Sequence, residues 1–177
     1  NMNIKKVANI LINFSIKRLA EIFGLLIFSG GFLLLISLAT YSPEDPNFIF
    51  PENTKIENFL GFQGSYTSDL FFQSIGLIAF LIPISFILIG IDIFRKKEIF
   101  IVIQNLFYIT IYSLIGSTFF SYFYMNSFDL YINGNGGFVG NYLNQTFINS
   151  FIKSNENIFY YSLIVLVLII FLLSINF

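Results

Sequence analysis

The sequence has 177 residues, of which 56% are hydrophobic and 11% are charged, and its formal net charge is −1. About 25% of the residues of soluble domains are charged, so one water-soluble core does not accommodate so apolar a chain, and the near-zero charge gives no sign of a nucleic-acid surface. Histidine and cysteine are both absent, which excludes disulfides, thiolate or imidazole metal ligands, and a catalytic cysteine or histidine.

Four apolar runs are long enough to cross a bilayer, whose hydrocarbon core of about 30 Å needs about 20 apolar residues at the rise of an α-helix. None of these runs contains an aspartate, glutamate, lysine or arginine. The sequence therefore predicts an all-α, polytopic membrane domain over residues 22–177, preceded by a basic cytoplasmic segment at residues 1–21. The predicted spans are 22–40, 70–91, 99–123 and 158–177.

A secretory signal peptide is the competing interpretation of the first span, because Leu38-Ala39-Thr40 loosely resembles a small-residue cleavage site. The apolar run is longer than the roughly 7 to 15 residues of a signal-peptide core. Its length favours a span that is retained.

The first outer loop, residues 41–69, opens with Tyr41-Ser42-Pro43-Glu44-Asp45-Pro46. Its two prolines lack a backbone donor and bias the residues before them toward extended geometry, so no helix is expected to continue through this stretch. Residues 56–60, followed by Gly61, predict a short helical turn before the second span. A rigid solvated turn explains the whole loop without any binding role.

The second and third spans are separated only by the segment from Phe94 to Glu98, so they are expected to form an antiparallel hairpin. Pro83 predicts a kink in the second span, and Gly76 and Gly90 permit close neighbours. Small residues on one side of the third span predict a packing seam; they are Ser113, Gly116, Ser117 and Ser121.

The second outer loop, residues 124–157, contains the helix-breaking run Asn133-Gly134-Asn135-Gly136-Gly137. The apolar residues after it repeat at helical spacing, which predicts one short amphipathic helix over residues 138–152. This helix is too short to span and is expected to lie in the outer interface or to pack against the bundle. A re-entrant loop that lines a pore is the alternative.

Lysine and arginine are distributed unevenly between the two sides of the predicted spans. Only Lys55 and Lys153 fall on the side of the two long loops, whereas seven basic residues fall on the other side: Lys5, Lys6, Lys17, Arg18, Arg95, Lys96 and Lys97. The positive-inside rule then places both termini in the cytoplasm. Glu21 and Asp92 stand at cytoplasmic helix ends, where local ion pairing explains them.

The sequence contains no recognisable catalytic constellation. It has no glycine-rich phosphate loop with a following Lys-Ser or Lys-Thr, no cluster of metal ligands, and no nucleophile with a plausible base. We therefore predict no enzyme activity and no cofactor for this segment. The lack of ionisable residues inside the spans disfavours a proton-coupled transporter, and a small solute permease or channel subunit stays as the alternative function.

Several motifs follow one another in a recognisable order along the chain. They are Ser37 to Pro46 at the end of the first span, Asn58 to Gly64 before the second, the series Asp69, Gly76, Pro83 and Gly90, and Gly136-Gly137-Phe138-Val139-Gly140 before the last span. In this order they resemble the N-terminal four-helix membrane domain of the FtsK/SpoIIIE family of DNA translocases, which act in bacterial cell division and chromosome segregation.

The resemblance implies a membrane anchor that brings a DNA translocase to the division septum of the bacterial inner membrane and helps to assemble its oligomer. The implied partners are membrane lipid, further copies of the chain and other cell-division proteins. The family's pattern continues beyond Phe177 with a cytoplasmic linker, a RecA-like motor that uses ATP and magnesium, and a DNA-reading domain. ATP hydrolysis and DNA binding are therefore expected only in that further part.

The resemblance also implies which residues shape the outer loops that meet other division proteins. The alternative is that these residues merely terminate helices. They are Tyr41, Pro43, Asp45, Pro46, Gly136, Gly137 and Gly140.

Overall fold

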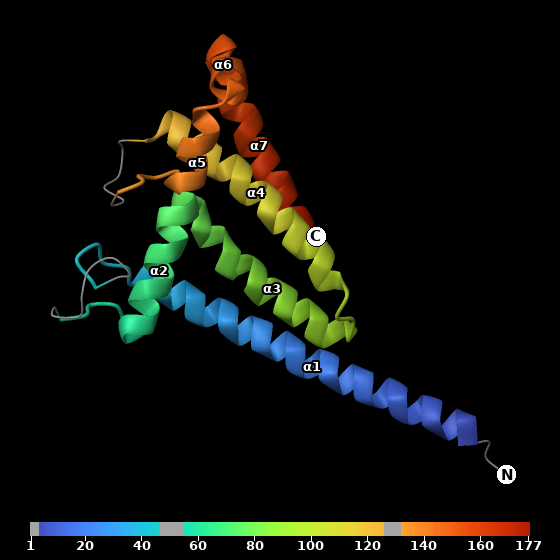
Figure 1. Cartoon of the computed structure of the whole chain (residues 1–177). Coiled ribbons are helices and arrows are strands. Elements are labelled where there is room, and N and C mark those ends of the chain that lie inside the picture. Colours follow the sequence, from blue (N-terminus) through green and yellow to red (C-terminus); the bar gives the residue numbers. More distant parts are fainter. Residues whose placement is uncertain (1–3, 47–54, 126–131) are drawn as a thin grey trace.

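The computed structural model describes residues 4–46, 55–125 and 132–177, and its regular elements in these ranges are all helices. Four longer helices form two pairs, α1 (Ile4–Ala39) beside α3 (Leu81–Lys96) and α4 (Ile101–Phe123) beside α7 (Glu156–Ser174) (Figure 1). The all-α fold class is thus confirmed.

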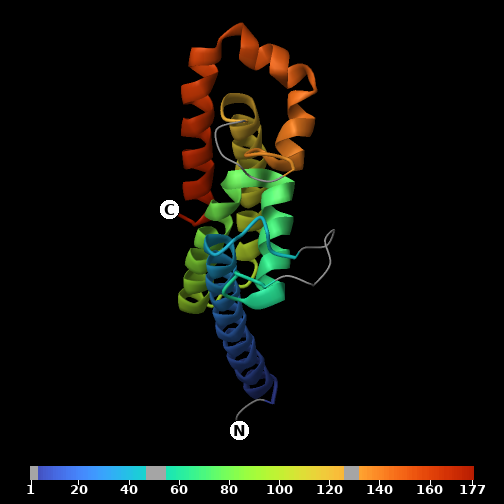
Figure 2. The ribbon, with the colours of Figure 1, turned by 90° about the vertical axis from the view of Figure 1, so that its left-hand side faces the viewer.

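Three short helices gather at one end of the molecule, which we call the loop end. They are α2 (Gly61–Ile75), α5 (Gly137–Asn144) and α6 (Phe147–Ser154). Seen from the side, α5 and α7 flank α4, and α6 joins them (Figure 2). The opposite end, where a tight turn joins α3 to α4, is the hairpin end.

Among the described residues, four helical units are long and apolar enough to cross a membrane: Ile4–Ala39, Gly61–Lys96, Ile101–Phe123 and Glu156–Ser174. Each contains most or all of one span predicted from the sequence. Long, uncharged apolar runs are a strong signal, because every backbone polar group inside lipid needs a partner within its own helix.

The helix α1 begins much earlier than the predicted span. It starts at Ile4 and continues without interruption to Ala39, so the described part of the basic N-terminal segment is helical. At 1.5 Å per residue, a helix of this length measures about 54 Å, against a hydrocarbon core of about 30 Å. Its N-terminal part accordingly extends beyond the hairpin end (Figure 1).

The sequence predicts a kink at Pro83 in the second unit. In the structure the change of direction lies at Gly76 instead. Gly76 has φ +71° and ends α2, and a 3-10 segment, η1 (Gly76–Phe80), leads into α3. Pro83 is the third residue of α3. Proline is tolerated there because the amide groups of the first turn have no partner within the helix.

The prediction of a single helix over residues 138–152 is wrong, because the structure divides this segment into two helices, α5 and α6. The break lies at Gln145 and Thr146. Thr146 is extended, and its hydroxyl oxygen accepts a hydrogen bond from the amide of Ile148 at 3.4 Å. A threonine in this position caps the start of a new helix.

The buried core lies where α1, α2, η1, α3 and α4 meet, around Leu38, Phe72, Ile89 and Tyr112. Three hydroxyl groups inside the bundle lie within hydrogen-bond distance of one another. The hydroxyl of Ser85 lies 3.0 Å from that of Tyr112 and 3.3 Å from that of Ser174. These bonds link α3 to both α4 and α7.

Ion pairs fasten the hairpin end. Glu21 of α1 contacts Arg18 of the same helix and reaches Lys97, which lies just after α3, with its other oxygen at 2.9 Å. Lys97 adopts a left-handed conformation with φ 60° and ends α3. Asp92 pairs with Lys96 at 2.9 Å.

Candidate functional site

Asp45 joins two separated parts of the first loop. Its side chain is 4% exposed, and its two carboxylate oxygens accept hydrogen bonds from the backbone amides of Glu57 at 2.7 Å and Asn58 at 2.9 Å. The next residue, Pro46, is buried, and its carbonyl accepts a bond of 2.6 Å from the hydroxyl of Ser65 in α2. The start of the loop is thus tied both to the loop's end and to α2.

Asn58 is a buried link between α1 and α2 that the prediction of site residues did not include. Its amide nitrogen donates to the carbonyl of Ser37 at 2.9 Å, and its oxygen accepts from the amide of Leu60 at 3.1 Å. The hydroxyl of Ser37 donates to the carbonyl of Gly64 at 2.6 Å. We call Ser37, Asp45, Asn58 and Ser65 the loop clamp. The only sign of this role in the sequence is an asparagine shortly before the helix-breaking Gly61.

Tyr41 and Pro43 flank the loop clamp differently. The ring of Tyr41 lies edge-on to that of Phe72 at 4.8 Å, and its hydroxyl donates to Asp69 at 3.5 Å. Pro43 is exposed, at the second position of a turn closed by a bond of 3.2 Å from the amide of Asp45 to the carbonyl of Ser42. Proline favours this position because its fixed φ matches the turn.

The three predicted glycines belong to a junction between α2, α4 and α5. A Cβ atom on Gly136 would lie 2.6 Å from the carbonyl oxygen of Ser117, and one on Gly140 would lie 2.3 Å from the same oxygen. Gly137 has φ +65°, and its Cβ would lie 2.6 Å from the amide nitrogen of Gly76. We call Gly76, Gly136, Gly137 and Gly140 the glycine junction.

Hydrogen bonds hold the glycine junction together. The amide of Leu77 donates to the carbonyl of Asn135 at 2.8 Å, and the hydroxyl of Ser117 donates to the carbonyl of Gly136. The hydroxyl of Ser121 donates to the side-chain oxygen of Asn141 at 2.7 Å. The predicted seam of small residues on α4 therefore contacts this junction through Ser117 and Ser121. Gly76 is part of the motif series in the sequence but is not among the predicted site residues.

Most of the predicted site residues are buried, so few of them present a side chain to a partner. Asp45, Pro46, Gly136, Gly137 and Gly140 are buried, Tyr41 is half-buried and Pro43 is exposed. The exposed side chains beside the loop clamp and the glycine junction include Glu44, Phe59, Phe138 and Tyr142. The buried residues set the positions of these exposed ones.

The arrangement offers packing and hydrogen bonding rather than acid–base chemistry. No group of three or more aspartate, glutamate, histidine or cysteine residues that could hold a metal lies within the part of the chain that the structure describes. The carboxylate of Asp45 is occupied by two backbone amides. The geometry is that of a folded, hydrogen-bonded surface at the loop end of a membrane domain.

Comparison with known proteins gives a consistent result. The family model for the 4TM region of DNA translocase FtsK/SpoIIIE matches residues 16–177. The protein named DNA translocase FtsK from Rickettsia bellii (strain RML369-C) is 34% identical over 67 residues, and that from Rickettsia typhi (strain ATCC VR-144 / Wilmington) is 31% identical over 67 residues. Each alignment covers 38% of this chain but only 9% of the relative. No solved structure matches the chain.

Proposed function

The chain belongs to the family defined by the 4TM region of DNA translocase FtsK/SpoIIIE, and from this premise we propose that it anchors a DNA translocase in the bacterial inner membrane and places it at the division septum. The observation that carries the proposal is the match over residues 16–177, which includes most of the first apolar helical unit and all of the other three. The anchor itself is non-enzymatic. ATP, magnesium and DNA are handled by the motor part of the translocase.

We propose that the hairpin end and both termini face the cytoplasm. The basic residues Arg95, Lys96 and Lys97 lie at this end, and Lys17 and Arg18 lie on α1 beside it. Positively charged segments beside membrane spans are retained on the cytoplasmic side. The loop end, with the loop clamp and the glycine junction, then faces outward.

We propose two kinds of protein partner. Other cell-division proteins meet the loop end, where the loop clamp and the glycine junction position exposed side chains such as Glu44, Phe59 and Phe138. Further copies of the chain meet around α1, whose N-terminal part exposes large apolar side chains, among them Leu11 and Phe14. Association of several copies would remove this surface from water.

The proposed placement at the septum is tested with a fluorescent protein fused after Phe177 and imaged in dividing bacterial cells. We expect a band at the division plane. A matched control carries only residues 1–98 before the same fluorescent protein, so that the fusion point also lies at the hairpin end, and is expected to label the whole cell envelope evenly. Even labelling by the full chain as well would contradict septum placement.

A further inference from the structure

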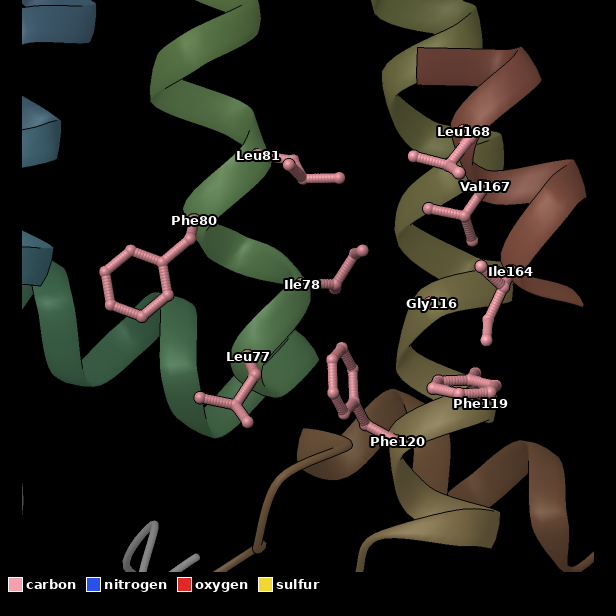
Figure 3. A pocket seen from close by; sticks show the side chains of 10 residues that line it. All are labelled: Leu77, Ile78, Phe80, Leu81, Gly116, Phe119, Phe120, Ile164, Val167 and Leu168. Carbon is pink, nitrogen blue, oxygen red and sulfur yellow. The ribbon is translucent and has the colours of Figure 1, made fainter. Parts of the chain in front are cut away.

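An apolar cavity of about 290 Å³ lies between the two helix pairs of the domain. One wall comes from η1 and the start of α3, with Ile78 and Leu81, and the other comes from α4 and α7, with Phe120, Ile164 and Leu168 (Figure 3). Every lining residue is apolar. We call this cavity the inter-pair groove.

The groove exists because the helices pair in a particular way. Helix α1 packs along α3 and α4 packs along α7, whereas α3 and α4 make few contacts with each other. The two pairs approach at Gly116 of α4, where a Cβ atom would lie 2.3 Å from the end of the Ile78 side chain. Around this contact point the walls separate and leave the groove (Figure 3).

The chemistry of the walls excludes ordered water as the occupant. A buried water needs about 2–4 polar partners, and the side chains that line the groove supply none. An empty space of this size would deprive the walls of dispersion contacts. An apolar molecule is the occupant that fits the lining.

The mouth of the groove faces the outside of the bundle, because Leu168, which lines the groove, is 54% exposed. Leu168 belongs to a membrane-spanning unit, so the medium at the mouth is the hydrocarbon of the bilayer. A partner helix is about 10 Å wide with its side chains and is much bulkier than one extended acyl chain. A slender acyl chain is the better match to an apolar groove of about 290 Å³.

We propose that the inter-pair groove holds one acyl chain of a membrane phospholipid as a bound lipid. The chain enters at Leu168 and lies between Ile78 and Ile164. It fills the space that α3 and α4 leave open and contacts both helix pairs. The lipid is thus part of the packed domain, in contrast to the mobile lipid around α7.

The test uses the full chain in bilayer nanodiscs with a phosphatidylethanolamine that carries a diazirine in the middle of one acyl chain. After irradiation, labelled peptides are located by mass spectrometry. Val167→Phe fills the groove, and Val165→Phe is its matched control because Val165 is 52% exposed on the same helix and does not line the groove. We expect strong labelling around Ile78 and Gly116 in the unchanged chain, lowered several-fold by Val167→Phe and unaltered by Val165→Phe.

Equal labelling of the groove in both variants, or no labelling around Ile78 in the unchanged chain, would overturn the proposal. Ile164→Phe is a second filling variant, used where Val167→Phe lowers the melting temperature. A photoreactive diazirine analogue of leucine at Leu81, which lines the groove and keeps the size of the native side chain, distinguishes a lipid from a second copy. A bound lipid gives an adduct of lipid mass, and a second copy gives a cross-linked dimer. Dimers without lipid adducts would also overturn it.

Discussion

The carboxylate of Asp45 accepts hydrogen bonds from two backbone amides that have no carbonyl partner in a regular helix or strand. Glu57 and Asn58 lie shortly before α2, and their amides both donate to the carboxylate of Asp45 at the start of the loop. Hydrogen bonds to a charged acceptor are worth more than those between neutral groups. Asp45 therefore contributes to the stability of the loop end out of proportion to its size.

Replacement of Asp45 by alanine leaves two backbone donors without an acceptor in a buried position. We expect Asp45→Ala to lower the free energy of unfolding by about 2 to 4 kcal/mol, and Asp45→Asn by less because it keeps one acceptor oxygen. The measurement is unfolding of the purified domain in mixed micelles. Glu44→Ala is the control, since Glu44 is exposed in the same turn, and a loss as large as that of Asp45→Ala would contradict this role.

At the scale of single residues, the sequence pointed to Asp45 and to the three glycines but not to what they touch. The acceptor of the Leu77 amide is the backbone carbonyl of Asn135. Every residue has such a carbonyl, so the sequence does not show which one accepts the bond. Gly76 and Gly137 meet although they are far apart in sequence. Such contacts depend on how the helices are placed, which the local sequence does not determine.

At the scale of elements, the crossing of α1 and α3 depends on glycines in both helices. A Cβ atom on Gly24 would lie 2.7 Å from the amide nitrogen of Phe94 and 2.8 Å from the carbonyl oxygen of Gly90. Small residues at such crossings let two backbones approach, which is the main source of helix attraction in lipid. The sequence predicted this property for Gly90, and its partner was visible only in the structure.

Two glycines of the same helix provide a matched experiment on this crossing. Gly24→Ala is expected to push α1 away from α3 and lower the free energy of unfolding by about 1 to 3 kcal/mol. A Cβ atom on Gly30 would have no neighbour within 4 Å. Gly30→Ala is therefore expected to leave the free energy of unfolding unchanged or raise it by up to about 1 kcal/mol. Unfolding in mixed micelles compares the two, and equal losses would show that helix propensity and not close packing governs the position.

Helix ends were harder to predict than helix existence. Apolar length identified all four spanning units, whereas the start of α1 and the division of residues 138–152 were missed. Between Ile4 and residue 22 the sequence contains no residue that would interrupt a helix, because lysine and asparagine are tolerated inside one. The division at Thr146 depends on a capping hydroxyl, a signal that the apolar periodicity around it outweighed in the prediction.

At the scale of the whole molecule, the two helix pairs are joined firmly at their ends and loosely between them. The turn between α3 and α4 connects them at one end, and the glycine junction connects them at the other. The number of spans followed from the sequence, since each span must satisfy its own backbone. The pairing of α1 with α3 and of α4 with α7 did not, because lipid-facing and partner-facing surfaces are equally apolar.

The orientation of the domain is open to a direct experiment, because the sequence has no cysteine and any single introduced cysteine is unique. Phe59 at the loop end is 78% exposed, and Phe100 in the turn between α3 and α4 is 84% exposed. The positive-inside rule predicts that Phe59→Cys reacts with a membrane-impermeant maleimide in intact spheroplasts. Phe100→Cys is expected to react only after the membrane is permeabilised, and the unchanged chain is expected not to react at all.

Both changes replace an exposed phenylalanine by the same thiol, so a difference in labelling reports location rather than reactivity. The reverse pattern would place the basic hairpin end outside and would require the loop end to meet cytoplasmic partners.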